Sequence, residues 1–299
     1  MNAPDYSVKD VFLRATSNNL ILDSEVIEWV TLDSTYTEAY CAGGRSGGVA
    51  IFHECLINAL EKIDSDVNFN LFDNDGDSLI DSITFFHSGF AAEWGKPDEY
   101  GTPYTDRIWS HKWGIYPPWT SGEAIRVGKY HVNPGVWGIS GSAIGRIGVV
   151  SHETAHFFGL VDRYDTSGAG NGLGSFSLMA NSWGVDGSQR YPPNLSACDK
   201  MEHGWVNIID IERLGNYQID SQCDSNTIYR IGNGKFGLPQ GEFFLLEYRQ
   251  SCDYDILLEP GLAIYHYDAQ ALDVMTNDKS DPLYGKRKSN FECRISLFW

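Results

Sequence analysis

The sequence predicts an α+β protein, in which helices and strands occupy separate parts of the chain. Apolar residues recur at helical spacing over residues 48–63, and a second helix is expected around His152. In the last third of the chain, apolar and polar residues alternate, which favours strands at 226–231, 243–249 and 261–268. With 299 residues and 42% hydrophobic content, the chain is long enough to bury a sizeable core.

The first half of the chain has a less regular pattern. Residues 6–32 predict short strands, and residues 82–87 predict a buried strand. Residues 92–134 are rich in aromatic residues, Gly and Pro, which is typical of loops that wall a cleft. A short helix is expected to end at Gly204.

The second helix carries the residues that indicate chemistry, within the segment His-Glu-Thr-Ala-His at 152–156. His152 and His156 lie one helical turn apart, so both imidazoles leave the same face and reach one zinc ion. Glu153 projects from nearly the same side, where its carboxylate reaches a water molecule on that metal. The opposite side is largely apolar and is expected to pack, through Val150, Thr154, Phe157 and Val161.

A catalytic zinc site usually has three protein ligands, so a third must follow the two histidines. Gly159 favours the left-handed conformation that ends a helix and turns the chain back. Asp162 stands six residues after His156, where the long zincin motif HExxHxxGxxH places its third histidine. Asp162 is therefore the predicted third ligand, and Asp165 or a more distant carboxylate is the alternative.

An acidic loop at residues 73–81 predicts a second metal site. Its spacing places oxygen ligands as in the first part of an EF-hand loop, from Asp73, Asp75, Asp77, the carbonyl of Leu79, and Asp81. So many oxygens in a flexible loop favour Ca²⁺. Position twelve is Thr84 and not the usual Glu, so the loop is not a complete EF-hand. The alternative is an acidic surface turn.

The charge of the chain excludes some partners. Forty acidic against 22 basic residues give a formal net charge of −18, which repels nucleic acids and anionic membranes. No apolar run approaches the length of a membrane span. We therefore expect neither nucleic acid nor a membrane span.

The cysteines indicate an oxidising compartment. Six cysteines without a CxxC pair favour disulfides over a thiolate metal site, although the sequence does not choose among the pairings. Asn194 begins a glycosylation sequon, which is compatible with a secreted protein. Residues 1–10 lack the apolar core of a signal peptide, and the apolar end at Trp299 is abrupt. We expect a trimmed or incomplete form of a secreted precursor whose signal and propeptide are absent.

Two further patterns are assigned by their position. Met179 lies 17 residues after Asp162, where metzincins have a methionine turn beneath the metal; the alternative is a methionine that fills an ordinary core gap. Glu247 and Arg249 share a strand face and predict a structural ion pair.

Taken in order, the motifs resemble the immune inhibitor A type of secreted metalloprotease, peptidase family M6. The matching segments lie within residues 72–268 and are FDNDGDSLID with the following HSG, RIWSHKW, HETAHFFGLVDRYD, SFSLMANSW, DKMEHGW, EFFLLEYRQ and GLAIYHYD. Val161 stands where relatives often have a proline before the aspartate.

The resemblance implies a metzincin-like catalytic domain over residues 1–299, with a mixed sheet, an active-site helix and a C-terminal β-rich subdomain. Residues 1–159 would hold the calcium loop and zinc helix, and residues 160–299 the methionine turn and β-rich extension. The resemblance also assigns zinc ligands His152, His156 and Asp162, catalytic Glu153, a methionine turn at Met179, and calcium at Asp73, Asp75, Asp77 and Asp81.

The implied activity is that of a secreted zinc metalloendopeptidase. It would hydrolyse peptide bonds of protein or peptide substrates through a zinc-bound water activated by Glu153. One alternative is a catalytically silent, calcium-stabilised binding or adhesion module on a protease fold, although a silent site has no need of Glu153. Another is a zinc hydrolase that acts on non-peptide amides.

Overall fold

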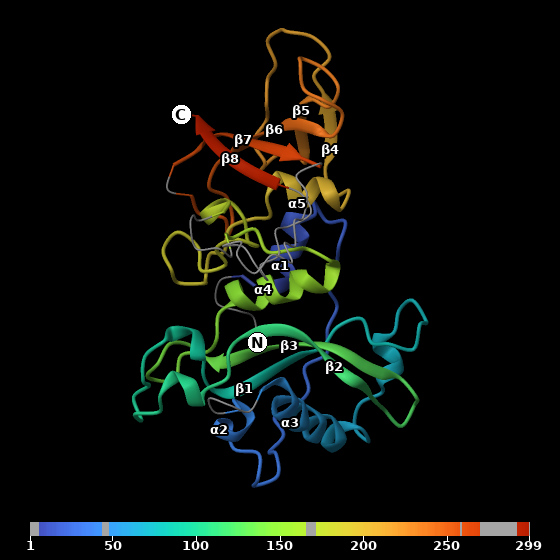
Figure 1. The fold of residues 1–299 in the computed structure, drawn as a ribbon, viewed down its shortest axis with the longest axis vertical. Coiled ribbons are helices and arrows are strands. Elements are labelled where there is room, and N and C mark those ends of the chain that lie inside the picture. The colour runs from blue at the N-terminus through green and yellow to red at the C-terminus, as the bar shows by residue number, and fades with distance from the viewer. Residues whose placement is uncertain (1–5, 44–47, 166–171, 258, 270–291, 299) are drawn as a thin grey trace, which may run out of the picture. The chain divides into compact units, whose positions relative to one another are not determined.

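The computed structural model describes residues 6–43, 48–165, 172–257, 259–269 and 292–298. The chain forms two compact units, the first made of Ser24–Gly159 and the second of Met1–Asp23 with Leu160–Trp299. Both contain helices and a mixed sheet, which confirms the α+β class (Figure 1). The predicted domain over 1–299, with parts at 1–159 and 160–299, stays a prediction.

The first unit is built on a three-stranded sheet. Its helices and strands are α2 (Glu38–Cys41), α3 (Gly48–Ile63), β1 (Thr84–Phe90), β2 (His111–Thr120), β3 (Arg126–Val136) and α4 (Ile147–Ala155). The middle strand, β3, is parallel to β1 and antiparallel to β2. Because residues opposite each other on neighbouring strands share a face, Lys112, His131 and Thr84 form one row across the sheet.

Helices cover both faces of this sheet, α3 on one and α4 on the other (Figure 1). Phe52 and Leu56 of α3 pack in one apolar core with Val127 and Tyr130 of β3. The bounds of α3 match the predicted helix at 48–63. Since side chains alternate along β3, Tyr130 faces this core while His131, the next residue, faces α4.

The expectation of loops over residues 92–134 is wrong for its second half, which forms the β2–β3 hairpin. Proline and glycine in β2 concealed the strand, and the register between β2 and β3 shifts between Gly114 and Trp119. An edge strand tolerates prolines because one side of its backbone has no strand partner. The strand predicted at 82–87 exists but runs as Thr84–Phe90, and it is only partly buried.

The second unit contains a five-stranded sheet in the order β4-β5-β6-β7-β8. Its helices and strands are α1 (Val8–Ala15), α5 (Ala197–Glu202), β4 (Asn207–Asp210), β5 (Thr227–Gly232), β6 (Glu242–Arg249), β7 (Gly261–Asp268) and β8 (Glu292–Phe298). Only the β4–β5 pair is parallel among these described strands. The strands predicted at 226–231, 243–249 and 261–268 are confirmed as β5, β6 and β7.

The expectation of strands over residues 6–32 is wrong, because this segment begins with helix α1 and continues without a strand. A capping box starts the helix: the Asp10 amide donates to Ser7 Oγ, and the Ser7 amide donates to the Asp10 carboxylate. Val11 and Phe12 are fully buried, and the Tyr254 hydroxyl donates to the Val11 carbonyl at 2.9 Å. The Ser-x-x-Asp spacing was the signal in the sequence that indicated a helix.

Charged side chains are buried in the second unit. Lys200 pairs with Glu247, and Arg249 pairs with Asp255 at 2.7 Å. The predicted Glu247–Arg249 pair is present as a longer contact of 3.8 Å. Removing one member of such a buried pair typically costs about 3–5 kcal/mol because an unpaired charge remains. These pairs therefore specify how β6 packs in its unit.

All six cysteines are paired, which confirms the prediction of disulfides. The bridges are Cys41–Cys55 in the first unit, and Cys198–Cys293 and Cys223–Cys252 in the second. Within the described residues, no helix combines the length and apolar character needed to cross a lipid bilayer.

Candidate functional site

Two histidines meet at the C-terminal end of α4. The helix ends at Ala155 and continues as a 3₁₀ turn, His156–Phe158. The ring centroids of His152 and His156 lie 4.9 Å apart, with the ring planes at 88°. This is the arrangement expected of two imidazoles that lie one helical turn apart and can bind one metal ion.

The chain then turns at Gly159, whose φ of 88° confirms the predicted left-handed conformation. A side chain at this position would strain the backbone. The ligand atoms of His152, His156 and Asp162 all lie within 4.8 Å of one another. Among the residues described, Asp162 joins this group and Asp165 does not. Two imidazole nitrogens and one carboxylate oxygen fit a zinc ion with a position left for water.

The back of α4 differs from the predicted apolar stripe. Val161 lies beyond the end of the helix and is 44% exposed, so its predicted packing role is wrong. The helix buries Ser151, Glu153 and Thr154. With few large apolar side chains on α4, polar contacts make a large contribution to its position on the sheet.

His131 on β3 supplies the central polar contact to α4. Its Nε2 lies 3.3 Å from Thr154 Oγ1 and 2.5 Å from Thr84 Oγ1. Thr154 donates its own hydroxyl proton to the Val150 carbonyl at 2.7 Å, so it is free to accept from His131. The other ring nitrogen, Nδ1, lies 2.7 Å from the Asn133 amide nitrogen, which donates to it. His131 thus connects the helix to two strands.

This network requires a neutral imidazole. Burial, together with the nearby His156 and His111, lowers the pKa of His131 to about 3. The ring is fully buried and packs against Phe157 at a centroid distance of 5.6 Å. The sequence analysis missed His131 because a single histidine in a strand has no motif that reveals its burial.

Lys112 on the edge strand β2 lies near the catalytic candidate Glu153. Its Nζ is 5.9 Å from the centroid of the Phe157 ring, and Phe157 directly follows His156. Burial lowers the pKa of Lys112 and Lys129 lowers it further, while Glu153 acts in the opposite direction. The charges of Lys112 and Glu153 therefore act on each other. Lys112 belongs to the segment RIWSHKW, in which no sequence pattern indicates a role for it.

The predicted methionine turn is buried and hydrogen-bonded in the second unit. Met179 is fully buried, and its carbonyl accepts from the Arg163 amide at 2.8 Å. The Arg163 side chain donates to Asp199 at 2.8 Å, and the Ser177 hydroxyl donates to the same carboxylate at 3.1 Å. The Met179 amide donates to Ser177 at 3.1 Å, so these four residues form one closed ring of hydrogen bonds. Arg163, the neighbour of Asp162, and Asp199 are further residues that the sequence analysis missed.

The acidic loop brings together three of its four predicted aspartates. Carboxylate oxygens of Asp73, Asp75 and Asp77 lie within 4.8 Å of one another. Asp81 is instead hydrogen-bonded to the Asn74 amide. Asp73 accepts from three backbone amides in the loop, at 2.9 to 3.1 Å, and Gly76 provides the turn with a φ of 75°.

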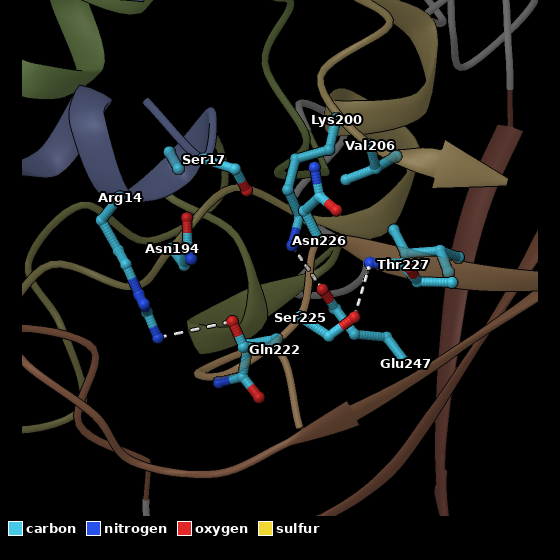
Figure 2. A pocket seen from close by; sticks show the side chains of 12 residues that line it. Arg14, Ser17, Asn194, Lys200, Val206, Gln222, Ser225, Asn226, Thr227 and Glu247 are labelled. Atoms are coloured by element: carbon cyan, nitrogen blue, oxygen red, sulfur yellow. Dashed lines mark hydrogen bonds and ion pairs between the residues drawn. The ribbon is translucent and has the colours of Figure 1, made fainter. Parts of the chain in front are cut away.

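A small pocket in the second unit is lined by none of the predicted metal-site residues. Figure 2 shows that polar side chains line it and that several of them bond to one another. Arg14 donates to the Gln222 carbonyl at 3.4 Å, and Lys200 pairs with Glu247. Because these groups already have partners, we assign the pocket a structural role.

Two further expectations concern the glycosylation sequon at Asn194 and the alternative ligand Asp165. The sequon at Asn194 is not accessible, because Asn194 is 3% exposed and the next two residues, Leu195 and Ser196, are fully buried. Glycosylation there is therefore incompatible with the folded unit. The ligand alternative Asp165 is described, but residues 166–171 after it lie outside the described part of the chain.

Comparison with known proteins defines the class. A sequence model of the immune inhibitor A peptidase M6 catalytic domain matches residues 4–206, which is more than half of the chain. The chain therefore belongs to the immune inhibitor A peptidase M6 family, as its motifs indicated.

Two relatives are similar to the chain at low identity. Immune inhibitor A of Bacillus thuringiensis subsp. alesti is 25% identical over 238 residues, which cover 68% of this chain and 33% of that protein. Pre-pro-metalloprotease PrtV of Vibrio cholerae serotype O1 is 25% identical over 212 residues, which cover 59% of this chain and 21% of that protein. The matched region thus spans a third or less of the length of these relatives.

The buried state of His131 predicts an acid-dependent loss of stability. Between its ordinary pKa of 6.5 and its folded pKa of about 3, the unfolded chain binds a proton that the folded chain does not. The free energy of unfolding therefore decreases as the pH falls below 6.5, by up to about 1.4 kcal/mol per pH unit. His131→Asn should show a shallower decrease between pH 6.5 and 4 in urea unfolding of the metal-free protein. His266→Asn, at a site one third exposed, is the control, and an unchanged slope in His131→Asn would contradict the assignment.

Proposed function

We propose that this chain is the catalytic part of a secreted zinc metalloendopeptidase. The observation that carries the proposal is the grouping of His152, His156 and Asp162 within 4.8 Å, next to the buried Glu153. Membership of the M6 peptidase family supports it independently. Protein or peptide chains are the proposed substrates.

Glu153 is the proposed catalytic residue. A zinc ion held by the two imidazoles and Asp162 would act as a Lewis acid and lower the pKa of a water molecule at the site. Glu153 would accept a proton from the attacking water and pass it to the leaving amine. Because Glu153 is only 8% exposed, its side chain is largely shielded from bulk water. Met179 would provide an apolar floor, as the methionine of a methionine turn does.

Calcium and secretion complete the proposal. The three grouped carboxylates of the acidic loop, with Asp81 and the Leu79 carbonyl, are the proposed ligands of a structural Ca²⁺. Three disulfides support an oxidising, extracellular location. The name of the relative PrtV describes a pre-pro form, and we propose that this chain is also made with a leader and a propeptide.

Replacing Glu153 with Gln should abolish peptidase activity while zinc stays bound. The change removes the proton acceptor and keeps the shape of the side chain, so casein hydrolysis should fall at least about a hundredfold. Zinc content is measured on the same samples, and Glu123→Gln, at an exposed site, is the control. Full activity in Glu153→Gln would reject Glu153 as the base. A wild-type chain that holds zinc but cleaves no casein or peptide library would favour the binding-module alternative.

Replacing Asp162 with Ala should release zinc, because two histidines alone hold the ion weakly. After dialysis against a low concentration of zinc, the wild-type chain should retain about one ion per chain and Asp162→Ala much less. Asp165→Ala is the matched control, since this neighbouring carboxylate lies outside the ligand group. Full zinc retention in Asp162→Ala together with loss in Asp165→Ala would transfer the ligand role to Asp165.

Calcium should stabilise the protein through the acidic loop. At a free calcium concentration 100 times the Kd, the expected gain in unfolding free energy is about 2.7 kcal/mol, which raises Tm by several degrees. Asp75→Asn removes one grouped carboxylate and should reduce this gain, whereas Asp66→Asn at a nearby exposed site should not. Thermal unfolding with calcium or magnesium measures the effect. An equal shift in both variants would show that calcium acts elsewhere.

A further inference from the structure

The face of the first unit's sheet that carries His131 also carries two lysines. Lys112 lies opposite His131, and Lys129 lies opposite Gly114, so both lysines share the face covered by α4. The chain as a whole has a formal net charge of −18. Two positive charges beside the α4 face are therefore a local exception in an acidic protein.

Lys112 differs from the other described lysines in its surroundings. Lys62, Lys200 and Lys235 each form an ion pair with a carboxylate. Among the described lysines without an ion pair, which are Lys9, Lys96, Lys112 and Lys129, Lys112 alone is partly buried. Its ammonium group lies above the ring of Phe157, the residue that follows the metal-ligand candidate His156.

In this environment the ammonium group of Lys112 is partly removed from water without forming an ion pair with a described residue. Removing a charge from water costs free energy unless an opposite charge or hydrogen bonds replace the solvent. Burial and the repulsion of Lys129 both lower the pKa of Lys112, and Glu153 only partly opposes them. An anionic group arriving from solvent would be attracted by both lysines, and it would lie beside Glu153 and His156.

We propose that Lys112, assisted by Lys129, is a specificity-determining residue that binds a side-chain carboxylate of the substrate. The proposal rests on the proposed peptidase function, and it names the preferred substrates as peptides with Asp or Glu beside the cleaved bond. The geometry supports this role because Lys112 is on an edge strand, within reach of Phe157 on the same side as Glu153. An edge strand leaves room for an incoming peptide on its unpaired side.

A different role for Lys112 predicts a different result. If Lys112 only adjusted the charge of Glu153, its replacement would slow the cleavage of every peptide to the same extent. If it binds a substrate carboxylate, only peptides with an acidic residue are affected. Matched peptides that differ in a single Glu or Gln therefore separate the two roles.

The first experiment maps cleavage sites in a mixed peptide library by mass spectrometry and then uses one Glu/Gln peptide pair from the sites found. The wild type should cleave the Glu peptide with a kcat/KM roughly tenfold above that of the Gln peptide, the size expected for a charge-assisted contact. Lys112→Met should remove the preference by lowering kcat/KM for the Glu peptide more than for the Gln peptide, and Lys112→Glu should reverse it. Lys62→Met, on α3 against the opposite face of the sheet, should retain it. An unchanged preference in Lys112→Met, or equal losses on both peptides, would overturn the proposal.

A binding measurement keeps this test independent of catalysis. The chain is stripped of zinc with a chelator, returned to calcium buffer, and titrated into fluorescently labelled Glu and Gln peptides. Tighter binding of the Glu peptide that disappears in Lys112→Met supports the proposal, and equal binding of the two peptides overturns it. Failure of the peptidase function would appear separately, as wild-type protein that holds zinc and cleaves neither peptide.

Discussion

The hydrogen bond between His131 and Thr154 is the contact on which the position of the candidate site depends. Helix α4 presents few large apolar residues to its sheet, so packing alone does not specify how far the helix slides or rotates. The neutral imidazole joins Thr154 to Thr84 and Asn133 and thereby fixes α4 against two strands. Because His152, Glu153 and His156 are on the same helical segment as Thr154, the direction of their side chains follows from this contact. A buried polar network of this kind specifies one arrangement only when its members are paired.

A second set of polar contacts acts on the chain after Gly159. The buried Arg163 donates through its backbone to Met179 and through its side chain to Asp199, and Asp199 also accepts from Ser177. These bonds hold the segment after Asp162 and the methionine turn in one local framework. Ionised groups are costly to bury, yet here each one satisfies several partners at once. In both units, therefore, the residues next to the candidate ligands are oriented by buried hydrogen bonds.

The features that were predictable from the sequence have a short repeat or a fixed spacing. The helix at 48–63, the strands β5 to β7 and the turn at Gly159 follow from apolar periodicity and from the left-handed preference of glycine. The grouping of His152 with His156 follows from helical spacing, and Asp162 joins them after the turn at Gly159. The β2–β3 hairpin was missed because prolines and glycines in an edge strand obscure the alternation of side chains. Helix α1 was missed because residues 6–32 were interpreted together as short strands, although Ser7 and Asp10 form a capping box. His131 and Lys112 were beyond prediction, since their roles depend on pairing between strands that lie apart in the sequence.

The missed residues His131 and Lys112 lie in one row across the sheet. Thr84, His131 and Lys112 lie side by side across β1, β3 and β2, on the face that supports α4. His131, the middle member of the row, is buried and bonded to the helix, and Lys112 is on the edge strand β2, where solvent and an incoming chain have access. The same strand pairing that positions the helix therefore also places the Lys112 charge over Phe157, where it acts on Glu153. In an acidic chain, this local and partly desolvated charge is the feature on which the proposed preference for acidic substrates rests.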